Sequence, residues 1–276
     1  MQPVRDLASR GKFWAAKGAA IWVGIAILVL WDVAVRVFEL PWYALPPPSQ
    51  VAVALYNGLI AFPLEKGDLM YRGAYYFHAY YTLAETFIGW IGGSLIGIFI
   101  AVLLYQFKFA ERVFVPYISA TQALPKIAIA PVFMIWLGLG IGSKIALVLT
   151  TAFFPVMINT LLGFQTVPAE RVDLMRSLGA SRAQIYRMVI FPSALPSMLA
   201  GVELALLFSY LAAVAAEFVG AGQGLGLLVV VMGQMLDMAG LFSILVLMAI
   251  LGWSSDTAVR KITRKVCFWA EEEQQR

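Results

Sequence analysis

The sequence predicts an all-α, polytopic membrane bundle, and three observations support this. Of the 276 residues, 61% are hydrophobic and only 13% are charged, whereas a soluble domain has about 25% charged residues. The mean hydropathy is +0.82. Runs without Asp, Glu, Lys or Arg recur along the chain, among them residues 86–107 and 145–169. At about 20 apolar residues per spanning helix, the chain has room for about six spans in one membrane domain, predicted at 19–259.

The first span is predicted at 19–38, after a basic segment at 1–18. Its apolar run is longer than that of a signal peptide, so we expect it to be retained. The other spans are predicted near 79–104, 114–138, 144–164, 196–219 and 239–259. The third contains Pro116, Pro125 and Pro131, each of which removes a backbone donor. An interfacial helix followed by a short span is therefore an alternative around 107–138.

The distribution of basic residues predicts the orientation. With the N-terminus inside, fifteen Lys and Arg residues fall on the inner side and four on the outer side, with Lys126 unassigned. This asymmetry favours cytoplasmic termini, including a C-terminal tail at 260–276. It also gives an outer loop at 39–78, a cytoplasmic loop at 165–195 and an outer re-entrant segment at 220–237. The outer four are Arg36, Lys66, Arg72 and Lys144.

Small residues recur every four positions in two predicted spans. This spacing lets helices approach closely in lipid, within one chain or between chains. The stripe in the fifth span ends in a carboxylate and is expected to face a partner helix or a pathway. The positions are Gly89, Gly93 and Gly97 in the second span, and Gly201, Ala205, Ser209, Ala213 and Glu217 in the fifth.

Ionisable side chains inside a membrane are costly and point to function. Glu85 and Glu217 are therefore candidates for the substrate pathway or for gating, together with Ser209 and Ala213. A structural hydrogen-bonding role for Glu217 is an equal alternative. Asp32 and Arg36 are spaced to pair with each other, and Glu203 is placed to snorkel or to meet an inner basic residue.

The sequence favours neither catalysis nor a metal site. Cys267 is the single cysteine and His78 the single histidine. An internal disulfide is thereby excluded, and a His/Cys metal cluster is disfavoured. The spans carry no Ser/His/Asp set, and His78 is expected at the membrane interface.

The segment 168–192 predicts two short helices joined at a sharp angle. Pro168 suits a first helical turn, Gly179 suits a left-handed helix end, and Ser181 can cap a second helix that Pro192 ends. Several apolar side chains on this segment would be exposed unless a partner covers them. They are Val172, Leu174, Met175 and Leu178.

This loop resembles the coupling loop of permease subunits of bacterial binding-protein-dependent ABC importers. That loop reads Glu-Ala-Ala, three residues, Gly, nine residues, then Ile-x-Leu-Pro. Gly179 and Pro192 match it, and Leu174 and Met175 replace the paired alanines. The other pattern positions and their neighbours in the loop are Asp173, Ala180, Ser181, Arg182, Val189 and Phe191.

Ordered blocks along nearly the whole chain resemble the nitrate/sulfonate/taurine-type branch. The blocks are LPPPS at 45–49, ALPKIAIAPVFMIWLGLG at 123–140, FFPVMINTLLG at 153–163, LGASRAQIYRMVIFPSALP at 178–196 and AEFVGAGQGLG at 216–226.

The resemblance implies a type I importer permease of the bacterial inner membrane, with no nucleic acid as a partner. It implies a second permease copy, most simply a homodimer, cytoplasmic subunits that hold ATP-Mg, and a periplasmic substrate-binding protein. The chain itself has no GxxxxGK[ST] phosphate loop. A secondary transporter or channel driven by an ion gradient is the alternative from another class.

The resemblance leaves the substrate open among nitrate, sulfonates, taurine, bicarbonate, pyrimidine precursors and riboflavin. Many anion-transporting relatives carry arginine in the helix where this chain has Glu85. A carboxylate facing the pathway would repel an anion. Glu85 therefore favours a neutral or heterocyclic substrate.

Overall fold

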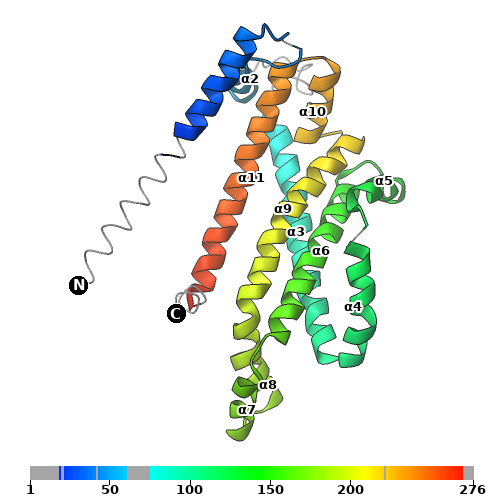
Figure 1. The fold of residues 1–276 in the computed structure, drawn as a ribbon. Coiled ribbons are helices and arrows are strands. Elements are labelled where there is room, and N and C mark those ends of the chain that lie inside the picture. The colour runs from blue at the N-terminus through cyan, green and yellow to red at the C-terminus, as the bar shows by residue number, and fades with distance from the viewer. Residues whose placement is uncertain are drawn as a thin grey trace, which may run out of the picture. The chain divides into compact units, whose positions relative to one another are not determined.

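The computed structural model describes residues 19, 22–41, 43–60, 75–122, 124–220 and 222–269, and the regular elements within these ranges are all helical (Figure 1). The predicted all-α class is thereby confirmed. Among the described residues, four helices are long and apolar enough to cross a membrane. They cover Tyr75–Gln106, Ile141–Gln165, Arg182–Gly220 and Met238–Val266. The total of six spans and the position of the termini stay predictions, because residues 1–18 and 270–276 lie outside the described residues.

The chain divides into two compact units, of which the first comprises residues 1–73 and 231–246. Its described parts include a helix over residues 22–37, the short helix α2 (Pro48–Leu59) and the start of α11 (Met238–Val266). The rings of Trp31 and Phe242 lie 5.7 Å apart. Asp32 and Arg36 form the expected ion pair at 2.7 Å. α2 begins at Pro48, the last residue of a proline run, because proline suits the first turn of a helix.

The second unit comprises residues 74–230 and 247–276. Its core is formed by α3 (Tyr75–Gln106), α6 (Ile141–Gln165) and α9 (Phe191–Gly220), which pack against one another. The backbones of α3 and α6 approach very closely. A Cβ atom added at Gly93 would lie 2.5 Å from the carbonyl oxygen of Leu149, and one at Gly97 would lie 2.8 Å from that of Phe153. The bare glycine faces therefore permit this helix pairing.

The run at 114–138 does not form one continuous helix. It is divided among α4 (Lys108–Gln122), the 3₁₀ turn η1 (Lys126–Ile129) and α5 (Ala130–Leu137). Pro125 is extended and precedes η1, and Gly138 ends α5 with φ +80°. The continuous span predicted at 114–138 is therefore interrupted, because Pro125 withholds a donor that a continuous helix would need. The alternative of an interfacial helix followed by a short span stays a prediction.

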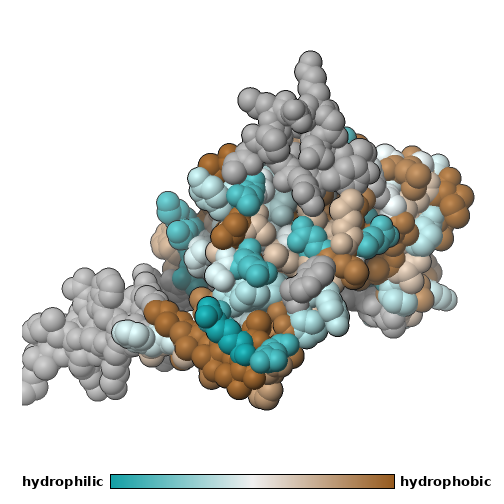
Figure 2. Space-filling view, turned by 90° about the horizontal axis from the view of Figure 1, so that it is seen from above, coloured by the Kyte–Doolittle hydropathy of each residue, from teal (hydrophilic) through white to brown (hydrophobic). Residues whose placement is uncertain are grey.

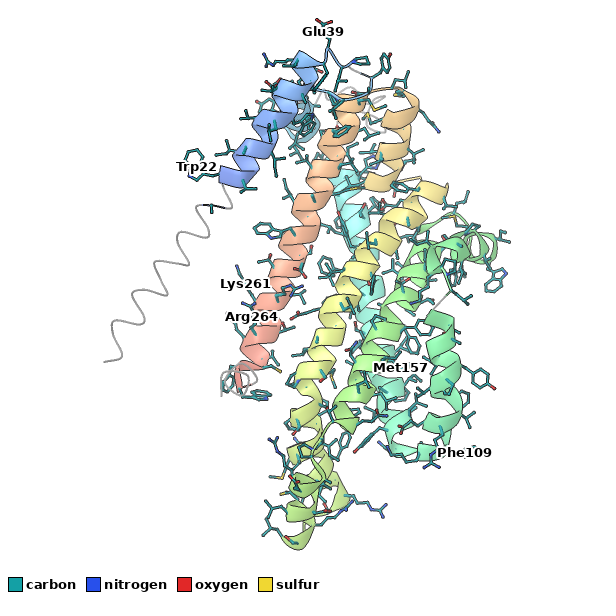
Figure 3. All side chains as sticks on the ribbon, in the orientation of Figure 1. Trp22, Glu39, Phe109, Met157, Lys261 and Arg264 are labelled. Carbon is teal, nitrogen blue, oxygen red and sulfur yellow. The ribbon has the colours of Figure 1, made fainter. Side chains whose placement is uncertain are left out.

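The apolar side chains of the described residues are only partly buried inside the molecule. Figure 3 labels Met157, which is fully buried, and Phe109, which is 82% exposed at the start of α4. Figure 2 shows apolar residues exposed at the rim of the view from above, beside hydrophilic ones. Outward-facing apolar side chains are expected where lipid is the solvent of a helix bundle.

Candidate functional site

The loop between α6 and α9 forms two short helices, α7 (Ala169–Ser177) and α8 (Arg182–Ile185). Gly179 takes φ +77°, the left-handed conformation expected after the first helix. Ser181 and Gln184 form a capping box: the Ser181 hydroxyl accepts the Gln184 N–H at 3.3 Å, and the Gln184 side chain accepts the Ser181 N–H at 2.8 Å. These local contacts set the angle between the two helices.

Pro192 does not end the second helix, contrary to the prediction. α8 continues through a π-helical turn, η2 (Tyr186–Ile190), directly into α9, so that residues 182–220 are helical without a break. The Phe191 N–H bonds to the Tyr186 carbonyl, five residues back. This wider turn comes immediately before Pro192 and accommodates the missing proline donor in the first turn of α9.

The loop is seated on the core by apolar contacts on one side only. Ile185 and Ile190 are buried in a cluster with Phe164, and Val172 and Met175 pack against that cluster. The other side faces outward, where the exposed fraction of two leucines is high. These are Leu174 at 61% and Leu178 at 72%. Beside them Arg176 pairs with Asp173 at 3.0 Å, and both side chains are exposed.

The residues that the sequence assigned to coupling are brought together in this loop. A cleft of about 900 Å³ lies between the loop and the end of α3, with Tyr105, Arg176 and Arg182 among its lining residues. Asp173, Leu174 and Met175 lie on α7, Gly179, Ala180 and Ser181 in the turn, Arg182 at the start of α8, and Pro192 on α9.

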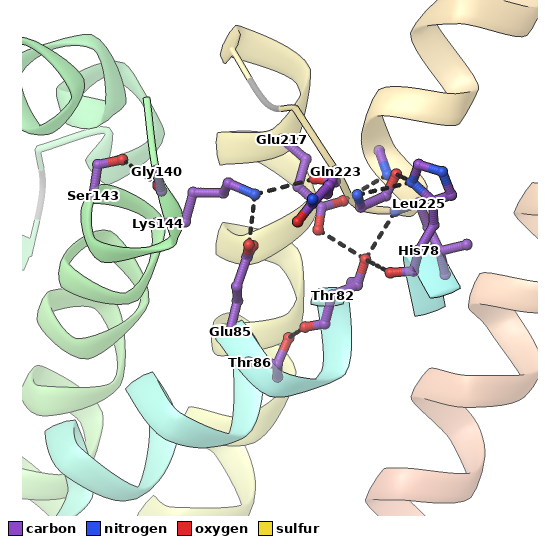
Figure 4. A network of polar contacts seen from close by, with 12 residues as sticks. His78, Thr82, Glu85, Thr86, Gly140, Ser143, Lys144, Glu217, Gln223 and Leu225 are labelled. Atoms are coloured by element: carbon purple, nitrogen blue, oxygen red, sulfur yellow. Dashed lines mark hydrogen bonds and ion pairs between the residues drawn. The ribbon is translucent and has the colours of Figure 1, made fainter. Parts of the chain in front are cut away.

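A second polar cluster lies at the start of α3 and α6 and the end of α9, away from the α7–α8 loop (Figure 1), and Figure 4 shows its contacts. Lys144, near the start of α6, donates to Glu85 of α3 at 2.5 Å and to the carbonyl of Gln223 at 3.1 Å. Both side chains of this ion pair are buried, Lys144 at 3% exposed and Glu85 at 0%. Glu85 is therefore neutralised by a cation inside the chain, and the expectation of a neutral or heterocyclic substrate loses its basis.

Glu217, at the end of α9, accepts hydrogen bonds from two directions. The Thr82 hydroxyl donates to it at 2.7 Å and the Gly226 N–H at 2.6 Å. The Thr82 oxygen also accepts the Leu225 N–H at 2.9 Å, and His78 Nδ1 accepts the Gly224 N–H at 3.0 Å. The segment 222–226, which leads into α10 (Leu225–Gln234), is thus held by side chains of α3 and α9.

The small-residue stripes lie against α6 within the same chain. A Cβ at Gly89 would meet Val148 at 2.5 Å, and one at Gly201 would meet Asn159 at 2.7 Å. In α9, Ala205, Ser209 and Ala213 are fully buried.

Sequence reasoning missed three members of the polar cluster, namely His78, Thr82 and Lys144. His78 lies in the first turn of α3 and is 2% exposed, and its position at the membrane interface stays a prediction. One signal was present: the predicted spans place Glu85 and Lys144 near the starts of two parallel helices, at the same end, where opposite charges can pair.

Residues 93–266 match the family described as binding-protein-dependent transport system inner membrane component. The formylaminopyrimidine transport permease protein of Halalkalibacterium halodurans is 28% identical over 90% of this chain and 94% of its own. The taurine transport system permease protein of Escherichia coli is 30% identical over 91% of this chain and 89% of its own.

Among solved structures, an inward-facing MetNI methionine ABC transporter chain is similar, with a TM-score of 0.61 and 24% identity. The match covers 68% of this chain and 94% of that chain, and supports the fold. The chain thus belongs to the inner membrane components of binding-protein-dependent transport systems, the permease subunits of ABC importers.

Proposed function

We propose that this permease works as one of two identical copies and is driven through the 168–192 loop by cytoplasmic subunits that bind ATP-Mg. A periplasmic binding protein would deliver a small solute to the pathway. Named permeases for taurine and formylaminopyrimidine support a small organic solute as the substrate class. ATP hydrolysis is assigned to the partner subunits, and translocation to this chain.

The exposed apolar side chains of this loop are the observation that supports a partner-binding surface here. Leu174 is 61% exposed and Leu178 is 72% exposed, and both lie beside charged residues. The other side of the loop packs on the core through the buried cluster that contains Ile185. An apolar ridge of this kind, rimmed by polar residues, is typical of a surface that a partner protein covers.

The continuous helix supports a mechanical role for the same loop. Because residues 182–220 are helical without a break, a displacement of α8 is transmitted along α9 rather than absorbed by a flexible joint. The buried cluster around Ile185 and Phe164 also ties the loop to α6. A push on α7 and α8 would therefore move two core helices together.

The test is co-purification with the candidate ATPase, followed by transport-coupled ATP hydrolysis in vesicles. Leu174→Gln combined with Leu178→Gln is expected to reduce ATPase recovery at least tenfold, because a polar amide replaces each apolar contact. Leu139→Gln is the matched control, since Leu139 is 68% exposed but lies before α6, at its other end. The control is expected to retain binding and coupling.

Gly179→Pro tests the turn itself. Proline cannot take φ +77° and removes the N–H that donates to the Arg176 carbonyl at 3.0 Å. We expect membrane insertion to be kept and ATPase coupling to be lost. Normal coupling in this variant, or transport by the chain without any ATPase, would overturn the proposal.

A further inference from the structure

We propose that Lys144, together with Glu85, Thr82 and Glu217, forms a latch that holds the segment 222–226 over one end of the α3–α6–α9 core. This end lies opposite the α7–α8 loop (Figure 1). The latch releases each time that end opens during transport, and Lys144 is its central positioning residue. The inference rests on the proposed transport function, because a latch is needed only where this end opens and closes.

Lys144 joins three separate parts of the chain. It belongs to α6, its ammonium group contacts Glu85 of α3 at 2.5 Å, and it donates to the backbone carbonyl of Gln223 at 3.1 Å. The side chain is 3% exposed. Lifting the segment takes the Gln223 carbonyl away from this buried ammonium group, which favours the closed state until water replaces that carbonyl.

The start of α10 depends on side chains from other helices. The first N–H groups of a helix have no partner within that helix. Here the Leu225 N–H donates to Thr82 and the Gly226 N–H to Glu217, at 2.9 and 2.6 Å. Together with Lys144, these contacts bind two N–H groups and one carbonyl of the segment, and His78 accepts the Gly224 N–H as well.

The segment lies directly on the Glu217 side chain. A Cβ added at Gly226 would lie 2.7 Å from Glu217 Cβ, and Gly224 takes φ +122°, a conformation suited to glycine. The glycines of this stretch therefore allow the backbone to reach the carboxylate. A side chain larger than hydrogen at position 226 would separate the two parts of the latch.

Polar contacts suit a closure that must open. Each protein–protein hydrogen bond can be exchanged for one to water when the end opens, so opening costs little free energy. An apolar seal would instead expose its whole apolar area to water, which is unfavourable. In the closed state the same contacts are sheltered, since Glu85 and Thr82 are both 0% exposed. The latch thus favours the closed state without fixing it.

The reporter for the test is Leu225→Cys in a Cys267→Ser background. Leu225 belongs to the segment and is fully buried in the closed state, so a membrane-impermeant maleimide should label a cysteine there only when the segment lifts. Gly222→Cys is the accessibility control, because position 222 is exposed and a Cβ there meets nothing within 4 Å. Labelling is measured on the complex with its ATPase in vesicles.

The variant is Lys144→Met combined with Glu85→Gln, which removes both charges of the ion pair and so does not leave Glu85 as a buried carboxylate without its cation. We expect labelling of the reporter cysteine at position 225 to rise about tenfold in the resting complex, the effect of losing the charge-assisted hydrogen bond from Lys144 to the Gln223 carbonyl. Thr82→Val is an independent second variant with the same expected direction. Lys261→Met, on an exposed lysine of α11, is the matched control and should change nothing.

A second readout separates a latch from a merely structural contact. In the parent reporter, labelling should rise when ATP turns over with binding protein present, and in the double variant it should already be high and independent of turnover. The latch proposal would be overturned by resting labelling that is unchanged in both variants. It would also be overturned if labelling of the reporter cysteine with Lys144 and Glu85 intact did not depend on ATP turnover. Loss of the proposed function would instead appear as failure to recover the ATPase with the wild-type chain.

Discussion

Two adjacent glycines of α3 should respond to alanine with opposite signs. At Gly93 a Cβ would lie 2.5 Å from the Leu149 carbonyl oxygen and 2.8 Å from the Ala152 Cβ. These atoms belong to the α6 backbone or are fixed to it, so the two helices must move apart to admit the methyl group. The cost in the free energy of folding lies at the upper end of the overpacking range, about 3 kcal/mol. The higher helix propensity of alanine stabilises the helix by about 1 kcal/mol. Gly93→Ala is therefore expected to destabilise the protein by about 2 kcal/mol.

Gly92→Ala is the matched control on the same helix. There the nearest atom is the end of the Leu149 side chain, at 3.4 Å, which is an ordinary contact. Only the propensity gain of about 1 kcal/mol remains, so this variant should be more stable than the parent. The two variants differ by about 3 kcal/mol in total, which is the overpacking cost, because the propensity gain is common to both.

The assay is the midpoint temperature for loss of monodisperse protein in detergent, followed by size-exclusion chromatography. Gly93→Ala should lower this midpoint and Gly92→Ala should raise it slightly. Shifts of the same sign and size for the two variants would refute the reasoning, because both gain the same methyl group and differ only in what it meets.

Two further predictions concern the ends of the chain's described helices. Ser181→Ala removes the hydroxyl that accepts the Gln184 N–H, and should weaken the turn by about 1 kcal/mol and lower stimulated ATP hydrolysis without lowering membrane insertion; unchanged hydrolysis would contradict a role for this cap. Cys267 is buried after α11 and burial raises the pKa of its thiol. Since the thiolate is the reactive form, maleimide labelling of the native protein at pH 7 should be slow and should accelerate with rising pH or after denaturation; rapid labelling at pH 7 would contradict the burial of this side chain.

The sequence predicted the helices well where a charge-free apolar run is long. Charge-free apolar runs placed α3, α6 and α11 within a few residues, because about twenty consecutive apolar residues have few other stable states in lipid. Prolines were harder to interpret. Pro125 and Pro131 lie where the region 114–138 is divided, whereas Pro116 lies inside α4 and Pro192 lies in an unbroken helix that a π-turn precedes. Local composition does not distinguish these outcomes, since neighbouring helices decide whether a lost donor is tolerated.

The two ends of the core differed in how much of them could be predicted. The α7–α8 loop depends on local chemistry, namely a left-handed glycine and a capping serine, and both positions were readable from the sequence. The polar cluster depends on contacts between residues far apart in the chain. Glu217 was expected to serve a pathway or a hydrogen bond, and its contacts with Thr82 and Gly226 required the packing of α3, α9 and the segment before α10.

The sequence alone determined that the chain is a membrane protein, that it is all-helical and which family it belongs to. Apolar runs, cap residues and motif spacing are properties of contiguous segments, so they can be recognised without the tertiary structure. Only the tertiary structure decided which charges meet. Glu85 looked like a free carboxylate until Lys144 was found beside it, 59 positions further along the chain. Pairing of this kind is set by the register between packed helices, which depends on side-chain volumes along both faces.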